Sequence, residues 1–161
     1  MQYLNGILNT TTDPYFADYN VYVAYSLDPQ KRTGDVCYII QDRNGNIETH
    51  CKTGIIDTTS VRLQLLCVCS ALLNIKNNKS VRVITNDTFF IEASSYKRLD
   101  DGANKDLKKR MYMEMTRMEC VCLSLPLTAT DKSMVEECKE QIKNQKAHTE
   151  KQNKIITKQI K

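Results

Sequence analysis

One stretch, residues 58–92, constrains the fold more than any other, because it predicts an amphipathic helix followed directly by a buried strand. Apolar side chains recur every three or four residues along its first half, as on a helix that packs against a sheet. This stripe consists of Val61, Leu65, Val68, Leu72 and Ile75, widened by Leu66, Cys69 and Leu73. The residues before it that can cap a helix are Asp57, Thr58, Thr59 and Ser60.

Residues 81–85 then predict a short strand, because four of the five are β-branched. The strand ends in the polar run Asn86, Asp87 and Thr88, and Asp87 or Thr88 is expected to cap a second helix that reaches Ser94 or Tyr96. In open α/β sheets, ligands bind at the carboxyl ends of the strands. The polar run is therefore the place where we expect a site.

Three strands are predicted before the central helix, at residues 21–27, 35–41 and 47–53. Asn44-Gly45 lies between the second and third of them, and Asn-Gly is the turn dipeptide typical of a tight hairpin. These strands should therefore form an antiparallel sheet.

After the charged loop at residues 97–104, residues 105–118 predict a helix, residues 120–127 a strand that Pro126 ends, and the following residues a last helix. The buried stripe of the first of these helices consists of Leu107, Met111, Met115 and Met118. Thr130 or Asp131 should cap the last helix, whose apolar face consists of Val135, Cys138 and Ile142.

The predicted order is three strands, a helix, a strand, two helices, a strand and a helix. A right-handed crossover from the first strand to the fourth gives an α/β fold with a five-stranded mixed sheet flanked by helices. We expect an N-terminal arm at residues 1–20, one domain at residues 21–145, and a Lys-rich tail at residues 146–161 that is a protruding helix or a frayed end.

Composition narrows the functional classes. The sequence contains no run of 18 apolar residues, so we expect no membrane span. Residues 1–18 lack the features of a signal peptide. The seven Cys are an odd number, and most lie in apolar runs, so we expect buried, reduced thiols and a cytoplasmic protein. On a helix, Cys67 and Cys69 point about 200° apart and cannot bind one metal ion. The sequence contains no zinc-ligand spacing, P-loop, dinucleotide fingerprint or nucleophile elbow.

Positive charge is concentrated at the C-terminal end. Residues 139–161 hold seven Lys against two Glu, a net charge of +5, whereas the other 138 residues hold 16 basic and 17 acidic side chains. Basic side chains also cluster at the start of the helix at residues 105–118. We predict that nucleic acid, if bound, contacts Lys105, Lys108, Lys109 and Arg110 on that helix and Lys143 and Lys146 near the tail. For both groups the alternative is a solvated surface.

The order of elements, the Asn-Gly hairpin, the helix-strand-helix unit and the final helix together resemble the ribonuclease H-like family. The resemblance covers roughly residues 20–145. It implies two Mg²⁺ or Mn²⁺ ions held by four carboxylates that hydrolyse phosphodiester bonds.

The resemblance assigns those four carboxylates to positions that mostly lack an acid here. The first falls on Tyr25, or on Ala24 if the register shifts by one residue; the second falls on Gln64 and the third on Asn86. The fourth falls on Glu136 or Glu137 in the last helix, and the loop at residues 128–130 lacks the His that the family often carries there.

Three missing negative charges matter for a metal site. One unit charge is worth about 4 kcal/mol toward another at ~4 Å in an effective dielectric of ~20, and Mg²⁺ requires anionic oxygen ligands. We therefore expect no catalytic metal and no other cofactor. The amides of Gln64 and Asn86 are expected either to bind a ligand or to bond to each other and to water.

The sequence therefore predicts a catalytically inactive ribonuclease H-like domain that acts as a binding or scaffold module in a nucleoprotein or multi-protein assembly. It would contact a protein partner, or nucleic acid through the basic helix or the tail, and no membrane. One alternative is a divergent nuclease that binds Mg²⁺ or Mn²⁺ through Glu136 or Glu137 with Asp28 and Asp87. Another is a purely structural subunit of a viral particle or polymerase complex.

Overall fold

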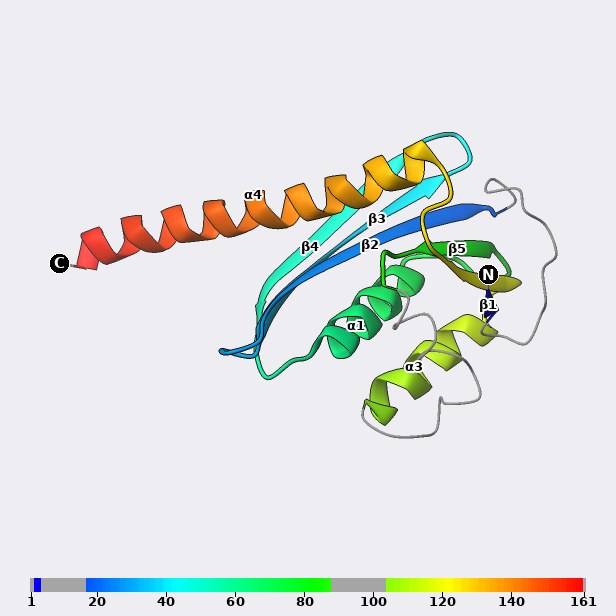
Figure 1. The fold of residues 1–161 in the computed structure, drawn as a ribbon, viewed down its shortest axis with the longest axis horizontal. Helices are drawn as coiled ribbons and strands as arrows, with labels where there is room; N and C mark the ends of the chain where they lie inside the picture. Colours follow the sequence, from blue (N-terminus) through cyan, green and yellow to red (C-terminus); the bar gives the residue numbers. More distant parts are fainter. Residues whose placement is uncertain (1, 4–16, 88–103, 161) are drawn as a thin grey trace.

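The computed structural model describes residues 2–3, 17–87 and 104–160 (Figure 1). The strands are β1 (Gln2–Tyr3), β2 (Tyr19–Asp28), β3 (Thr33–Asp42), β4 (Ile47–Ile55), β5 (Ser80–Ile84) and β6 (Cys120–Ser124). The helices are α1 (Ser60–Leu73), α3 (Lys105–Thr116) and α4 (Ala129–Ile160). The helix predicted to begin at Asp87 or Thr88 lies almost wholly outside the described residues. Among the described helices, none is long and apolar enough to cross a membrane.

The sheet has the strand order β1-β6-β5-β2-β3-β4. The central strand β2 pairs antiparallel with β3 along ten residues and parallel with β5 on its other side, as predicted. β5 in turn pairs parallel with β6. The α/β class and the mixed sheet of five strands are thus confirmed. The sheet also contains β1, two residues of the predicted irregular arm, which pairs with β6.

The β3–β4 hairpin forms at the predicted Asn-Gly turn. The Asp42 carboxylate accepts hydrogen bonds from the backbone N–H groups of Asn44 (2.9 Å) and Asn46 (3.0 Å). Gly45 has a φ of +85°, which glycine adopts without steric strain. This turn fixes the register of β4 against β3 from its first residue, because Ile47 pairs with Gln41.

Helices cover both faces of the sheet (Figure 1). On one face, α1 packs against β2 and β3 and is itself covered by α3. Met111 and Met115 of α3, and Met118 just after it, are buried as predicted. On the other face, α4 packs against β2, β3 and β4. All seven Cys are free thiols and five of them are buried, as expected for structural cysteines.

The buried surface of α1 is wider than the predicted stripe, because Cys67 and Ala71 are buried as well. Leu73, which belongs to the predicted stripe, is instead 50% exposed. The reason is that α1 lies between two layers: the Cys67 thiol reaches the carbonyl of Cys37 on β3 (3.5 Å), and the Cys69 thiol reaches that of Leu107 on α3 (3.8 Å). Thr59, one of the four predicted capping residues, is the N-cap.

α4 begins earlier than predicted, because Thr128 rather than Thr130 or Asp131 caps it. The Thr128 hydroxyl accepts from the backbone N–H of Asp131 (3.0 Å), and the Asp131 carboxylate accepts from the N–H of Thr128 (3.3 Å). This reciprocal pair is a capping box. The helix then continues without a break past residue 145, the predicted end of the domain, and protrudes from the body (Figure 1).

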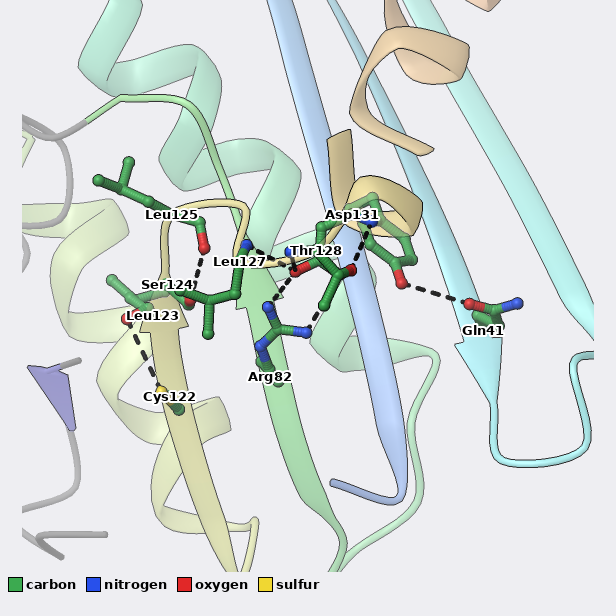
Figure 2. A network of polar contacts seen from close by, with 10 residues as sticks. Gln41, Arg82, Cys122, Leu123, Ser124, Leu125, Leu127, Thr128 and Asp131 are labelled. Atoms are coloured by element: carbon green, nitrogen blue, oxygen red, sulfur yellow. Dashed lines mark hydrogen bonds and ion pairs between the residues drawn. The ribbon is translucent and has the colours of Figure 1, made fainter. Parts of the chain in front are cut away.

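A buried ion pair joins the start of α4 to the sheet (Figure 2). Arg82, on β5, is 1% exposed, and both of its terminal nitrogens donate to the Asp131 carboxylate, one of them at 3.2 Å from Oδ1. Asp131 also accepts from the backbone N–H of Leu127 (2.9 Å). Burial opposes ionisation of Asp131, but the hydrogen bonds from Arg82 and the backbone outweigh it and leave the pKa of Asp131 lowered.

Replacing Asp131 with Asn should destabilise the fold by about 3–5 kcal/mol, because it removes the carboxylate charge to which both terminal nitrogens of the buried Arg82 guanidinium donate. Urea unfolding followed by circular dichroism measures this change. Because the pKa of Asp131 is lowered on folding, its contribution is complete above the unfolded value near ~3.9 and is lost as the pH falls below it. The difference in free energy of unfolding between the unmodified protein and Asp131→Asn should therefore shrink as the pH falls below ~3.9.

Glu136→Gln is the control, because the Glu136 side chain is 69% exposed in its pair with Lys139. Its effect should stay below about 1 kcal/mol. An Asp131→Asn variant as stable as this control would contradict the role of the ion pair.

Candidate functional site

The polar site lies where the first turns of α1, the second half of β2 and the end of β5 meet. Asp87 follows β5, and its Oδ2 accepts a hydrogen bond from Nε2 of Gln64 on α1 (2.9 Å). The same oxygen accepts from the hydroxyl of Tyr25 on β2 (3.3 Å). Side chains from two elements, α1 and β2, therefore converge on a carboxylate that follows β5.

Thr85 fixes the orientation of the Gln64 amide. Its hydroxyl donates to Oε1 of Gln64 (3.1 Å) and accepts from the backbone N–H of Asp87 (3.2 Å). Gln64 and Thr85 are 2% and 3% exposed. Since its oxygen is engaged by Thr85, Gln64 presents N–H donors and not an oxygen ligand toward Asp87.

The Tyr25 phenol stays neutral in this site. Burial raises the pKa of Tyr25, and the negative charge of Asp87 and the hydrogen bond to it raise that pKa further. Tyr25 is therefore a hydrogen-bond donor across the neutral pH range.

A cavity of about 790 Å³ opens beside this network. Its walls come from residues 23–27 of β2, from Ser60 at the start of α1, from the residues that follow β5, and from Val135 and Lys139 on α4. Asp87 and Lys139 bring one negative and one positive side chain to its lining. The cavity is suited to a polar ligand that carries both donors and acceptors.

Asn86 and Asp87 both line this cavity, although strand alternation predicts that only one of two neighbours faces a site. The reason is that β5 ends at Ile84, so neither residue lies in a regular strand. The contacts with Gln64 and Tyr25 are made by Asp87. The sequence placed both residues in the expected polar run, but it assigned the position of the third carboxylate to Asn86 and not to Asp87.

The two candidate positions on β2 face different layers of the fold. Tyr25 packs against the core on the α1 side of the sheet, whereas Ala24 belongs to the cluster beneath α4. Only Tyr25 therefore has a side chain that reaches the polar network.

The acids expected on α4 and at the end of β2 do not join Asp87 in the cavity lining. Glu136 pairs with Lys139 (3.1 Å), and Glu137 accepts from Gln141 (2.8 Å), both on the outer surface of α4. The Asp28 carboxylate accepts from the backbone N–H groups of Gln30 and Lys31 in the β2–β3 turn.

These residues do not fit the pair of divalent cations that the sequence resemblance implies. The accepting oxygen of Asp87 already receives two hydrogen bonds, and Gln64 offers donors to it. Within residues 17–87 and 104–160, no group of three or more His, Cys, Asp or Glu side chains is placed to hold a metal ion. The arrangement can bind by hydrogen bonding, but it lacks the charge that collects two dications.

The basic residues of the two predicted groups lie on different sides of the sheet. Lys105, Lys109 and Arg110 are exposed on α3, whereas Lys108 is only 9% exposed and does not belong to that surface. Lys143 and Lys146 are exposed on α4, which covers the opposite face. Because the two groups lie on opposite faces of the sheet, a single straight ligand cannot contact both of them.

On α4, a row of three lysines runs from the cavity toward the β2–β3 turn. Lys139 lines the cavity, and Lys143 and Lys146 follow on the next turns of the helix. Lys146 pairs with Asp35 (3.2 Å) beside a second pocket of about 350 Å³, which Lys31 also lines. We name these three residues, Lys139, Lys143 and Lys146, the α4 lysine row. The sequence indicated Lys143 and Lys146, whereas Lys139 joins them because α4 is one continuous helix.

No protein-family model matches the sequence, and no curated protein matches it significantly. A functional assignment must therefore come from the geometry of the site and of the α4 lysine row.

Replacing Asp87 with Asn should lower the pKa of Tyr25 toward the ordinary value of ~10, because the charge that opposes phenolate formation is removed. The pKa is measured by NMR titration of ring-labelled tyrosine, and the Tyr25→Phe variant identifies the signal. An unchanged pKa in Asp87→Asn would contradict the contact between the two side chains.

Proposed function

We propose that this chain is a catalytically inactive ribonuclease H-like domain that binds nucleic acid along α4 within a larger assembly. The strand order β6-β5-β2-β3-β4, with α1 on one face and α4 on the other, supports the family proposal. The observation that carries the functional part is the Asp87 network, in which Gln64 and Tyr25 donate to the carboxylate instead of adding charge to it.

The inactivity follows from the chemistry of these donors. Two-metal hydrolysis needs both ions, about 3.5–4 Å apart, to stabilise the attacking and leaving oxygens. One carboxylate already engaged by two hydrogen-bond donors supplies too little negative charge for a pair of dications. The divergent nuclease gains no support, because Asp28, Glu136 and Glu137 do not line the cavity with Asp87.

Binding to nucleic acid is supported by the α4 lysine row. Exposed lysines on successive turns of one helix face match a phosphate backbone, whose neutralisation releases counterions. Lys139 connects this row to the cavity, where the Ser60 and Asn86 side chains can hydrogen-bond a sugar or a base. Phosphates held by the row would thus lead a nucleotide into the polar cavity.

A protein partner is supported by a separate feature, the protruding end of α4. Ile155 and Ile156 are 56% and 52% exposed there, and Lys151, Lys154 and Lys158 surround them. Exposed apolar side chains rimmed by charge are typical of a docking surface. This end of α4 is the part of the chain best suited to join it to an assembly.

The unmodified protein should not cleave an RNA–DNA hybrid in millimolar Mg²⁺ or Mn²⁺, and neither ion should raise its melting temperature. The control is the double variant Tyr25→Asp, Gln64→Glu, which places two further acids beside Asp87. It should be less stable without metal because like charges repel, and metal should restore part of its stability. Cleavage by the unmodified protein that is lost in Asp87→Asn would overturn the proposal.

Changing all three residues of the α4 lysine row to Gln should weaken binding to duplex nucleic acid and reduce its salt dependence. Each lost phosphate contact lowers the slope of log K against log[salt] by about 0.9. Fluorescence anisotropy across a KCl series measures this slope. The matched control, Lys105→Gln with Lys109→Gln on α3, should leave the slope unchanged. An effect of the α3 pair without an effect of the α4 variant would place the interface on the other face.

A further inference from the structure

β4 forms one edge of the sheet, and among the described strands only β3 pairs with it. The strand is nine residues long, contains no proline, and six of its residues are exposed. Such an edge presents a row of backbone N–H and C=O groups that can pair with another strand. At the opposite edge of the sheet, β1 already covers part of β6.

The regular part of this edge is the segment 47–52. Its register against β3 is uninterrupted from the Gln41–Ile47 pair to the Val36–Lys52 pair, and the shift comes after it, between Val36 and Gly34. Gly54, with a φ of +72°, follows. α4 reaches this end of the strand, because Lys146 lines the same pocket as Gly54. A regular edge is thus available among the described strands at 47–52, and the Cys51 side chain of this segment packs toward α4 on one face of the sheet.

We propose that segment 47–52 pairs antiparallel with the same segment of a second copy of this chain, across a two-fold axis at His50. The two sheets then form one continuous sheet. The site at Asp87 plays no part in this contact, so the proposal goes beyond the proposed function and does not depend on it.

The position of the axis follows from charge. A two-fold axis perpendicular to the sheet keeps each side chain on its own face, so the axis passes through one residue of the segment. An axis at His50 places Glu48 opposite Lys52 of the second copy, and this pair occurs twice. An axis at Cys51 would instead place His50 opposite Lys52, and an axis at Thr49 would leave Lys52 without an acid. Opposite charges directly across a strand pair stabilise it.

Within one copy, neither charge has a cross-strand partner. Glu48 lies opposite Ile40 and Lys52 lies opposite Val36. Glu48, whose side chain is 55% exposed, pairs with its neighbour His50 (2.7 Å), and the His50 ring stacks on Tyr38. In the described part of the chain, no acidic side chain lies within ion-pair distance of Lys52. Charges of opposite sign at equal distances on either side of His50 favour a second copy over an unrelated peptide.

The symmetry has a consequence for α4. Because the axis is perpendicular to the sheet, the α4 helices of both copies lie on the same face of the joined sheet. Each copy contributes its own α4 lysine row, so a long polyanion would meet two rows at once. Paired sites of this kind bind more tightly than either site alone.

Sedimentation equilibrium tests the contact by charge reversal. A six-residue edge buries little surface, so we expect a weak dimer that is visible at about 100 µM protein. Glu48→Lys and Lys52→Glu should each weaken dimerisation about tenfold, because two attractive pairs become repulsive. The double variant Glu48→Lys, Lys52→Glu should restore it. A monomer at this concentration, or a dimer that the single reversals leave unchanged, overturns the proposal.

A disulfide trap tests the register. In a Cys51→Ser background, His50→Cys should form an intermolecular disulfide under mild oxidation, because the two-fold axis brings residue 50 opposite itself. The matched control, Lys52→Cys in the same background, should not form this disulfide, because residue 52 lies opposite residue 48 of the second copy. Circular dichroism of each variant verifies folding. Cross-linking of Lys52→Cys without cross-linking of His50→Cys overturns the proposed axis.

Discussion

The buried ion pair of Arg82 and Asp131 is the interaction on which the placement of α4 depends. Arg82 enters from the middle of β5, and Asp131 closes the capping box at the start of α4. One contact therefore joins the middle of the strand to the start of the helix. A buried charge left without its partner is strongly unfavourable, so α4 cannot shift along the sheet without losing stability. The positions of Lys139 and of the rest of the α4 lysine row follow from this anchor.

The Asp87 network depends on the same sheet through β2 and β5. Because these strands are parallel neighbours, β5 ends near the second half of β2, and Gln64 in the first turns of α1 reaches Thr85 and Asp87, which follow β5. A carboxylate, an amide and a phenol meet there, and their hydrogen bonds satisfy one another. Such a network brings one carboxylate and no second acid, so it offers little charge to a pair of divalent cations. It leaves a cavity whose polar lining comes from several elements of the fold.

Much of the fold was predictable, because its signals are local. Val81 to Ile84 form a strand where β-branched residues recur, and Asn44-Gly45 forms the hairpin where the turn needs a positive φ. The site was less predictable. Whether Asn86 or Asp87 meets Gln64 depends on where β5 ends, and a shift of one residue there changes which side chain faces the network. Lys139 was missed because the sequence shows no sign that α4 brings it to the cavity.

The sequence by itself determined the order of elements, the central position of β2 and the apolar faces of α1, α3 and α4. These properties follow from periodicity, turn residues and crossover handedness, which neighbouring residues carry. Only the tertiary structure decided that Asp87 accepts from Tyr25 and Gln64, that Arg82 has a buried counter-charge in Asp131, and that β4 is the last of the described strands in the sheet. The physical reason is that these contacts join residues between 23 and 62 positions apart, and local patterns carry no information about such pairs.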